Sequence, residues 1–591
     1  MPSWRDQSNK IHSNKLSKQI HQRWLIFSLA TSTLWLIKIT SPAVPENIEQ
    51  TLDSLVSRGI EKHLSNLQRG LEKESLRVDS NGLLAQTPHP YKLGSALTHP
   101  MITTDYCESL LEFVTPVHNN IEDLLQELQD IHHFTYQHIG DEKLWVNSMP
   151  CIVESEEKIP IARYGSSNVA KMKETYRRGL SYRYGSLMQT IAGIHFNFSM
   201  PDSFWSDYFE FDSSGESPDQ LPTRLQAQKS DKYFSLIRNF HRNSWIESYL
   251  FGASPAVCRS FLRGRAKCPT QNIGRGKHIL EDFEAHSFYA PNATSLRLSG
   301  LGYSNDAQAD IEICYNSIEH FVQSLRRAIQ TVNPDYEKFG VNVNGQHQQL
   351  NANLLQIENE FYSSIRPKRI TPSGESPSTA LQQRGVEYIE VRCIDLNPFV
   401  PIGIDADCIR FMDVLLLYCL FSDSGPLSPD DFRVAQTNQQ KIVLHGRDRH
   451  LKINTDQGEK PAKEVMMKLL GQMRPVAELL DQVNNSNHYR SMMTQQINKV
   501  EDAELTPSAK ILNQMRSEDL SFYEFSNEMS ENSERLFKQK RLDPETNQKL
   551  ENLATQSHAT QLEMESNDEL SFDEFLEDYF ERQNSLQYVD N

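Results

Sequence analysis

The sequence predicts an α+β protein in which several strands direct polar and charged side chains into one cavity. Side-chain type alternates along 195–199 and 386–392, which is typical of strands with one buried face. If 69–78 is also an extended strand, Glu72 and Glu74 point to one side, and Leu76 and Val78 continue that side towards a core. Segments with apolar residues at helical spacing lie between these stretches, and beyond about residue 404 the chain is mainly helical. We therefore expect the strands to belong to one sheet, with their polar faces on the same side.

The elements of the first two hundred residues follow from spacing and from turn residues. They are, in order, a helix over 48–68, a strand over 69–78, a turn at 79–82, a strand over 110–114, an amphipathic helix over 120–139 and a strand over 195–199. The turn has the sequence Asp-Ser-Asn-Gly, and Pro116 ends the second strand. Glu112 is a single charge inside that otherwise apolar strand, which is unfavourable unless the carboxylate is paired or binds a metal.

The middle of the chain is less regular. Residues 206–232 are polar and contain Gly215, Pro218 and Pro222, so we expect a surface excursion there. The remaining elements predicted before residue 404 are helix-like residues at 233–262, a strand-like stretch at 294–299, a helix over 315–331 and the strand 386–392.

Composition limits the class of protein. The chain has 591 residues, of which 38% are hydrophobic and 23% charged, as in soluble globular proteins with two or three lobes. The net charge of −18 argues against a nucleic-acid-binding protein, which needs a basic face. The eight cysteines lack CxxC or Cys/His ligand spacing, which favours reduced thiols in a cytoplasmic protein over disulfides or a zinc site.

The first 45 residues differ from the rest. Basic residues precede an apolar run from Trp24 to Ile37, a pattern that resembles a signal sequence or a membrane anchor. The run is short for a spanning helix, which needs about 20 apolar residues. We interpret 1–45 as an extension outside the fold, and membrane association is expected only through residues 24–37.

Acidic and imidazole side chains interrupt several of the strand-like segments. Glu72 and Glu74 point to the same side of their strand, and one such pair alone also fits an edge strand whose carboxylates face water. The complete set is Glu72, Glu74, Asp105, Glu112, His195 and Glu390. Carboxylate oxygens with one imidazole suit Mg²⁺ or Mn²⁺ and not Zn²⁺, and such ions neutralise phosphate oxygens during phosphoryl transfer.

Two arginines and the missing motifs complete the picture. Arg297 and Arg392 are able to hold a carboxylate or phosphate by two parallel hydrogen bonds, although a structural ion pair fits each of them equally well. The sequence has no GxxxxGK[ST], GxGxxG, HExxH or GxSxG motif. If the protein uses ATP, metal ions and arginines on a sheet must hold its phosphates.

Nine stretches resemble the gammaproteobacterial type of the glutamate–cysteine ligase family. They are RGLEKESLR (69–77), GSALTHPMITTD (94–105), LLEFVTP (110–116), MQTIAGIHFNFS (188–199), FGASPAVC (251–258), ATSLRLSGLGY (293–303), LQIENEFYSSIRPKR (355–369), SGESPS (373–378) and EYIEVRCIDLNPFVPIG (387–403). The resemblance implies a fold like the catalytic domain of glutamine synthetase, with a curved, mainly antiparallel sheet forming a funnel surrounded by helices. It places the catalytic domain at 46–545, followed by an acidic segment at 546–591.

The resemblance also implies an activity. ATP, L-glutamate and L-cysteine would become γ-glutamylcysteine, ADP and phosphate through a γ-glutamyl phosphate, with Mg²⁺ required. Two alternatives stay open at this point: a ligase that joins glutamate to a different amine, and a non-catalytic membrane-tethered relative.

By similarity, roles are implied for particular residues. The six acidic and imidazole residues would hold metal ions, Arg297 would bind glutamate, and Arg392 would stabilise the transferring phosphoryl group. The cysteine pocket would be lined by Tyr176, Tyr303 and Tyr362, with Arg177 and Gln189 nearby.

Overall fold

The computed structural model describes residues 48–584, except for 151, 211–220, 264–279, 284, 285, 303–307, 309, 310 and 373. The run Trp24–Ile37 and Tyr303 therefore lie outside the described residues. Residues from Ile48 onward form one unit of the chain. In the described part, no helix has the length and apolar character needed to cross a membrane.

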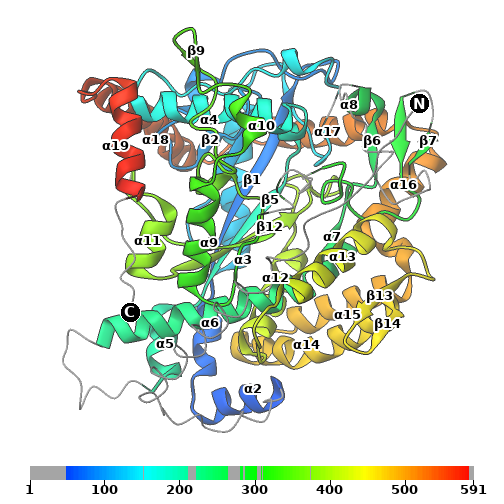
Figure 1. The fold of residues 1–591 in the computed structure, drawn as a ribbon. Helices are drawn as coiled ribbons and strands as arrows, with labels where there is room; N and C mark the ends of the chain where they lie inside the picture. Colours follow the sequence, from blue (N-terminus) through cyan, green and yellow to red (C-terminus); the bar gives the residue numbers. More distant parts are fainter. Residues whose placement is uncertain are drawn as a thin grey trace, which may run out of the picture. The chain divides into compact units, whose positions relative to one another are not determined.

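Within the described residues, the unit is built around one seven-stranded sheet whose pairs are all antiparallel. Its strands β1, β5 and β12 lie side by side in the middle of Figure 1. Six strands follow the order β11-β12-β5-β1-β3-β2, and β4 pairs with β1 beside that path. The bounds are β1 Gln68–Val78, β2 Ile102–Thr104, β3 Leu110–Val114, β4 Lys143–Leu144, β5 Ile194–Ser199, β11 Ile365–Lys368 and β12 Tyr388–Ile394. The predicted α+β class with a mainly antiparallel sheet is confirmed.

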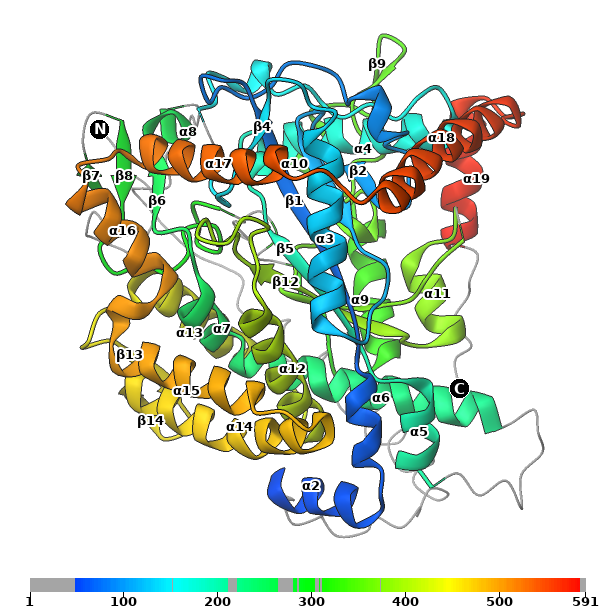
Figure 2. The ribbon, with the colours of Figure 1, turned by 180° about the vertical axis from the view of Figure 1, so that it is seen from behind.

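The sheet has one apolar face and one polar face because side chains alternate along each strand. The apolar face carries Leu71, Phe113, Phe196 and Val391, all of which are fully buried. Helix α3 (Ile121–Tyr136) packs against β1 and β3 (Figure 2). The polar face carries the acidic residues, and the candidate functional site lies on this face.

The other helices surround the sheet. They are α2 Ile48–Ser57, α4 Asn168–Tyr184, α5 Asp202–Tyr208, α6 Leu221–Asn243, α7 Trp245–Phe251, α8 Arg259–Arg263, α9 Ile318–Gln330, α10 Pro334–Glu337, α11 Pro377–Arg384, α12 Ala406–Phe421, α13 Pro429–His445, α14 Ala462–Asn484, α15 His488–Glu501, α16 Pro507–Ser517, α17 Phe522–Gln539, α18 Pro544–Ser566 and α19 Phe572–Asn584. Many begin at a side-chain cap, as α12 does where Asp405 accepts a hydrogen bond from the Cys408 amide.

In the part of the chain that the structure describes, three small sheets lie outside the main one. They are formed by β6 Ala256–Cys258, β7 Glu281–Phe283 and β8 Ser287–Tyr289, by β9 Asn342–Val343 with β10 Gln346–His347, and by β13 Lys452–Thr455 with β14 Gly458–Pro461.

A buried ion pair fixes the strand that carries Glu72 and Glu74. The Arg69 guanidinium donates from Nε to Asp413 Oδ1 (2.7 Å) and from Nη2 to Asp413 Oδ2 (2.8 Å). Asp413 lies on α12, and both side chains are almost completely buried. Such a bidentate pair sets the position of β1 against the helical part of the fold.

Four predictions of local structure were wrong. The helix expected over 48–68 ends at Ser57 and is followed by the 3-10 helix Glu61–Asn66, and the helix-like stretch 233–262 is divided among α6, α7, β6 and α8. The surface excursion expected up to residue 232 ends earlier, because α6 begins at Leu221 and Pro222 lies in its first turn, where proline is tolerated. No strand forms at 294–299. The amides of Thr294 and Ser295 both donate to the Val443 carbonyl, so this stretch docks on α13 and does not join a ladder.

Candidate functional site

The polar face of the sheet brings the acidic residues together through strand register. Glu72 on β1 lies directly opposite His195 on β5, and Glu74 lies opposite Glu112 on β3. Glu390 on β12 lies opposite Asn197, two residues beyond His195 on the same face. One ordinary antiparallel arrangement therefore converges residues that are more than 300 positions apart in the sequence.

Glu72, His195 and Glu390 form the tightest group. His195 Nδ1 lies 3.0 Å from Glu72 Oε2 and 3.9 Å from Glu390 Oε1. One ligand atom from each residue lies within 4.8 Å of the others, as a shared metal ion requires. Asn197 donates to Glu72 Oε1 (2.8 Å), and its own buried Oδ1 has no hydrogen-bond partner among the described residues.

His195 is suited to be a metal ligand. Burial and the nearby Arg392 guanidinium lower the pKa of the His195 imidazole, so the ring is neutral near pH 7. Nδ1 faces Glu72 Oε2 at 3.0 Å and Nε2 faces Glu74 Oε1 at 3.7 Å, so each ring nitrogen has a carboxylate oxygen with which it is able to share a cation. Two acceptors at this separation fit a cation between them.

Glu74, Asp105 and Glu112 form a second acidic group. Burial and the negative charge of Asp105 raise the pKa of the Glu74 carboxyl to about 8. Burial and the charges of Asp105 and Glu72 raise the pKa of Glu112 well above its ordinary value. Neither Asp105 nor Glu112 has a hydrogen bond or ion pair from its carboxylate within the described part of the chain. Accumulated negative charge of this kind fits divalent cations with oxygen ligands.

Cations accompany Glu390 on the neighbouring edge of the sheet. Lys368 Nζ lies 3.2 Å from Glu390 Oε1, and Arg392 Nη1 lies 3.0 Å from Glu390 Oε2. Burial alone would raise the pKa of Glu390, but Lys368 and Arg392 outweigh burial and hold it well below its ordinary value. Glu390 is therefore ionised throughout the physiological range.

Arg297 is buried next to the acidic face. Its Nη2 donates to the Arg392 carbonyl (2.9 Å), and its Nη1 lies 3.6 Å from Asp395 Oδ1. Asp395 also accepts hydrogen bonds from Ser254 Oγ (2.6 Å) and from the Ala253 amide (2.9 Å). Asp395 therefore ties the Arg297 loop to the end of β12.

The predicted tyrosine pocket is formed in part. Gln189 Nε2 donates to the Tyr362 hydroxyl (2.9 Å), and Tyr176 on α4 and Tyr362 are both partly buried and pack against the core. Arg177 donates from Nε to the Asp105 carbonyl, and its guanidinium stacks on the Tyr164 ring at 4.7 Å. Arg177 thus holds the Asp105 loop, while Tyr303 is outside the described residues.

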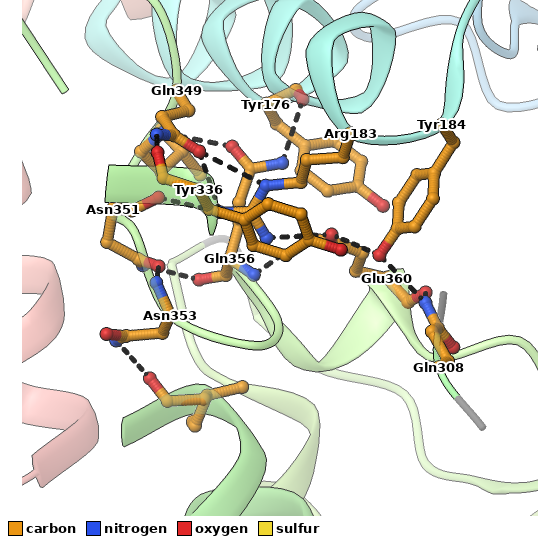
Figure 3. A network of polar contacts seen from close by, with 12 residues as sticks. Tyr176, Arg183, Tyr184, Gln308, Tyr336, Gln349, Asn351, Asn353, Gln356 and Glu360 are labelled. Atoms are coloured by element: carbon orange, nitrogen blue, oxygen red, sulfur yellow. Dashed lines mark hydrogen bonds and ion pairs between the residues drawn. The ribbon is translucent and has the colours of Figure 1, made fainter. Parts of the chain in front are cut away.

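A polar network supports this pocket from behind (Figure 3). Glu360 Oε1 accepts from Arg183 Nη1 (2.9 Å) and from the Tyr184 hydroxyl (2.8 Å), and Glu360 Oε2 accepts from the Gln356 amide (2.7 Å). The Gln356 side chain donates to the Tyr176 carbonyl (3.2 Å). The network joins α4 to the segment that ends at Tyr362.

A cavity of about 1010 Å³ opens beside the acidic face. Its lining includes His195, Arg297, Arg392 and Tyr362 from the site described above. It continues along residues of α6, α9 and α13. A cavity of this size suits a small-molecule substrate.

The sequence did not indicate three of the side chains that shape this site. Lys368 and Asn197 alternate with buried residues along their strands, and this alternation could have shown that both lie on the same face of the sheet as the acidic residues. Asp395 follows the end of β12 and carries no pattern, because its partners Ser254 and Ser295 are distant in sequence.

Comparison with known proteins identifies relatives over most of the chain. The glutamate–cysteine ligase family model matches residues 52–442. The glutamate–cysteine ligase of Alcanivorax borkumensis is 47% identical over 541 residues, covering 90% of this chain and 99% of that protein. The enzyme of the same name from Pseudomonas putida KT2440 is 45% identical, covering 87% of this chain and 95% of its own.

Solved structures agree with the sequence relatives. A crystal structure of glutamate–cysteine ligase from Francisella tularensis in complex with AMP has a TM-score of 0.79 and 35% identity, and the match covers 88% of this chain and 98% of that one. A bifunctional glutathione synthetase from Pasteurella multocida shares the fold, with a TM-score of 0.63 and 22% identity over 82% of this chain and 55% of its own.

Proposed function

The chain belongs to the glutamate–cysteine ligase family, and we propose that the acidic face, the two arginines and the tyrosine pocket carry out the reaction of this family. The reaction forms γ-glutamylcysteine with the use of ATP and is the first step of glutathione synthesis. The observation that carries the proposal is the convergence of Glu72, His195 and Glu390 within 4.8 Å on one face of the sheet. This face adjoins a cavity of about 1010 Å³.

The proposed metal ligands are Glu72, Glu74, Asp105, Glu112, His195 and Glu390. Their fit to Mg²⁺ rests on the donor set, on the raised pKa of Glu112 and on the buried Asn197 oxygen without a partner. Bound Mg²⁺, for which Mn²⁺ is able to substitute, supplies positive charge that lets the glutamate γ-carboxylate approach the terminal phosphate of ATP. Strand pairing holds the ligands in place before any substrate arrives.

Arg297 and Arg392 are proposed to bind the anionic parts of the substrates. Arg392 is proposed to stabilise the phosphoryl group during transfer, which is supported by its place in the cavity lining and by its hydrogen bond to Glu390. Arg297 lines the same cavity and is anchored by Asp395 and the Arg392 carbonyl. It is proposed to fix glutamate by a carboxylate, so that the γ-carboxylate points towards ATP.

The γ-glutamyl phosphate formed in this way is an activated acyl group that the cysteine amine attacks, which releases phosphate. We propose that Tyr176, Tyr303 and Tyr362 bind cysteine, with Arg177 and Gln189 beside them. The hydrogen bond from Gln189 to the Tyr362 hydroxyl gives that ring one orientation. The apolar ring faces suit a thiol side chain and exclude water from the acyl phosphate.

The reaction is tested by release of ADP with each component omitted in turn. The complete mixture of ATP, Mg²⁺, glutamate and cysteine is expected to release ADP at a rate at least tenfold above the mixture without cysteine. Glu390→Gln should lose most of the activity, because one ligand charge is removed. Equal rates with and without cysteine would contradict the proposal.

The identity of the amine is tested by replacing cysteine. A pocket for the cysteine side chain should accept 2-aminobutyrate, which has a similar shape, and should reject simple alkylamines. A preference for alkylamines would favour the alternative of a ligase for a different amine. We also propose that the enzyme works in the cytoplasm, where ATP and reduced cysteine are available.

A further inference from the structure

The edge strand β11 places a lysine against a proposed metal ligand. Arg366 lies opposite Glu390 in the register, and Lys368 lies opposite Tyr388, so both basic side chains are on the polar face of the sheet. Ile365 and Pro367 alternate with them and are buried. The motif IRPKR therefore presents two positive charges to the acidic cluster from its edge.

The cations around Glu390 are held differently. Arg366 donates to the carbonyls of Phe361 and Asn359, and its position is set by the backbone. Arg392 lies on β12, the same strand as Glu390, so strand pairing fixes its backbone next to that carboxylate. The ammonium of Lys368 has Glu390 as its only hydrogen-bond or ion-pair partner in the described part of the chain.

The exposures of the two partners differ as well. The Glu390 side chain is 1% exposed, whereas the Lys368 side chain is 30% exposed. The lysine therefore reaches a buried carboxylate from solvent through a flexible stem of four carbons. Its head is able to leave this position without breaking other contacts.

We propose that Lys368 is an exchangeable cation, which neutralises Glu390 in the metal-free enzyme and moves to the terminal phosphate of ATP when Mg²⁺ binds. The inference rests on the proposed function in one respect, namely that Glu390 binds a divalent cation.

Charge balance supports this exchange. Lys368 and Arg392 each hold one oxygen of Glu390, so a divalent cation at the same carboxylate would lie close to two positive charges, and the departure of one of them would relieve that repulsion. Lys368 is the more weakly held of the two, and its positive charge repels a metal ion at the same carboxylate. The proposed function brings the terminal phosphate of ATP to the metal ligands, and a lysine ammonium is a common phosphate ligand, so this phosphate is the anion to which Lys368 would move.

The test compares Lys368→Met with the wild-type enzyme. Mn²⁺ binding to the nucleotide-free protein, measured by electron paramagnetic resonance, should become about tenfold tighter, because a competing charge is lost. The KM for ATP at saturating Mg²⁺ should rise about tenfold, because a phosphate ligand is lost. The KM for cysteine should stay the same.

Two further variants serve as controls. Lys368→Arg keeps the charge and should bind Mn²⁺ within about threefold of wild type. Lys549→Met removes an exposed lysine that pairs with Glu127 at 3.0 Å on the surface, and it should change neither quantity.

The outcomes separate the two proposals. Unchanged or weaker Mn²⁺ binding in Lys368→Met, with wild type binding Mn²⁺ normally, would overturn the exchange and leave the metal site intact. Wild-type protein that binds no Mn²⁺, with or without ATP, would contradict the metal site and the exchange together.

Discussion

Arg297 reaches its position because residue 193 has no side chain. A Cβ atom on Gly193 would lie 2.0 Å from Arg297 Nη2, and Arg297 is 1% exposed, so the guanidinium has little room to move aside. The Gly193 amide also donates to Glu74 Oε2 (2.7 Å). One small residue thus adjoins both the proposed glutamate site and the acidic cluster.

Gly193→Ala is therefore expected to displace Arg297. The KM for glutamate should rise at least about tenfold, because small displacements of a positioning group are costly to catalysis. The melting temperature should also fall, because the added methyl group overpacks a buried site. Gly471→Ala is the matched control, because a Cβ there meets nothing within 4 Å, and it should leave the kinetics unchanged. An unchanged glutamate KM in Gly193→Ala would contradict the role given to Arg297.

Glu247 gives a prediction about pH and stability. Burial and the negative charge of Asp395 raise the pKa of the Glu247 carboxyl to about 8. In the unfolded chain this pKa is near 4.5, so between these values the folded state keeps a proton that the unfolded state has lost. Stability is then lost as pH rises from about 4.5 to about 8, because burial disfavours the charged form.

Glu247→Gln should remove this dependence. Its free energy of unfolding relative to wild type should increase by about 2–3 kcal/mol between pH 6 and pH 8, at about 1.4 kcal/mol per pH unit. Urea unfolding at the two pH values measures the difference. If both proteins lose stability equally over this interval, Glu247 is not protonated in the folded state.

At the scale of elements, the network in Figure 3 joins α4 to the segment that carries Tyr362. The side chains of Arg183 and Glu360 are both completely buried, so the charge of each is stabilised by the opposite charge of the other. Tyr176 lies on α4 together with Arg183, and Tyr362 lies two residues after Glu360. This ion pair therefore sets the distance between the two tyrosines.

Glu360→Gln should therefore destabilise the protein by about 3 kcal/mol, because the Arg183 charge stays buried without its partner. It should also raise the KM for cysteine more than the KM for ATP. Glu174→Gln on the same helix is the control. Glu174 pairs with Arg178 at 2.8 Å, and both side chains are only partly buried, so its loss should cost less than about 1 kcal/mol. Similar effects of both variants would contradict the supporting role of the network.

The same helix shows where sequence patterns are insufficient. Residues of α4 such as Arg183 are buried and polar, so the helix has no apolar stripe that spacing would identify. The strand β5 was predictable because its polar residues alternate with buried phenylalanines. The strand β1 has the consecutive charges Glu72, Lys73 and Glu74 and no such alternation, so it was indicated mainly by the turn residues that follow it. The stretch 294–299 imitates this alternation, but its backbone bonds to α13 and Asp395 holds its side chains, which are long-range contacts.

At the scale of the whole chain, the sequence predicted that Glu72, His195 and Glu390 share one face of the sheet, but it did not predict which of them are adjacent. Alternation shows which face each side chain takes, whereas register decides which residues meet. The pairing of Glu74 with Glu112 depends on the antiparallel alignment of β1 and β3. The position of Lys368 depends on β11 being an edge strand, which the sequence does not specify.

The last prediction concerns the residues before Ile48. The family model begins at residue 52, and the unit that contains the site begins at Ile48. A protein of residues 48–591 should therefore keep the kcat and the KM values of the full chain within about twofold, because all proposed ligands lie within it. The assay is ADP release with glutamate and cysteine, after both proteins are brought to equal concentration.

Fractionation of cells that express the two proteins tests the role of Trp24–Ile37 separately. If this run is only an extension, the full chain and the shortened chain should both be active in the supernatant after membranes are sedimented, since the run is shorter than the ~20 apolar residues of a spanning helix. Activity of the full chain confined to the pellet, with the shortened chain in the supernatant, would show that the run is an anchor. The cytoplasmic assignment would then be replaced by a membrane-bound ligase whose catalytic unit is unchanged.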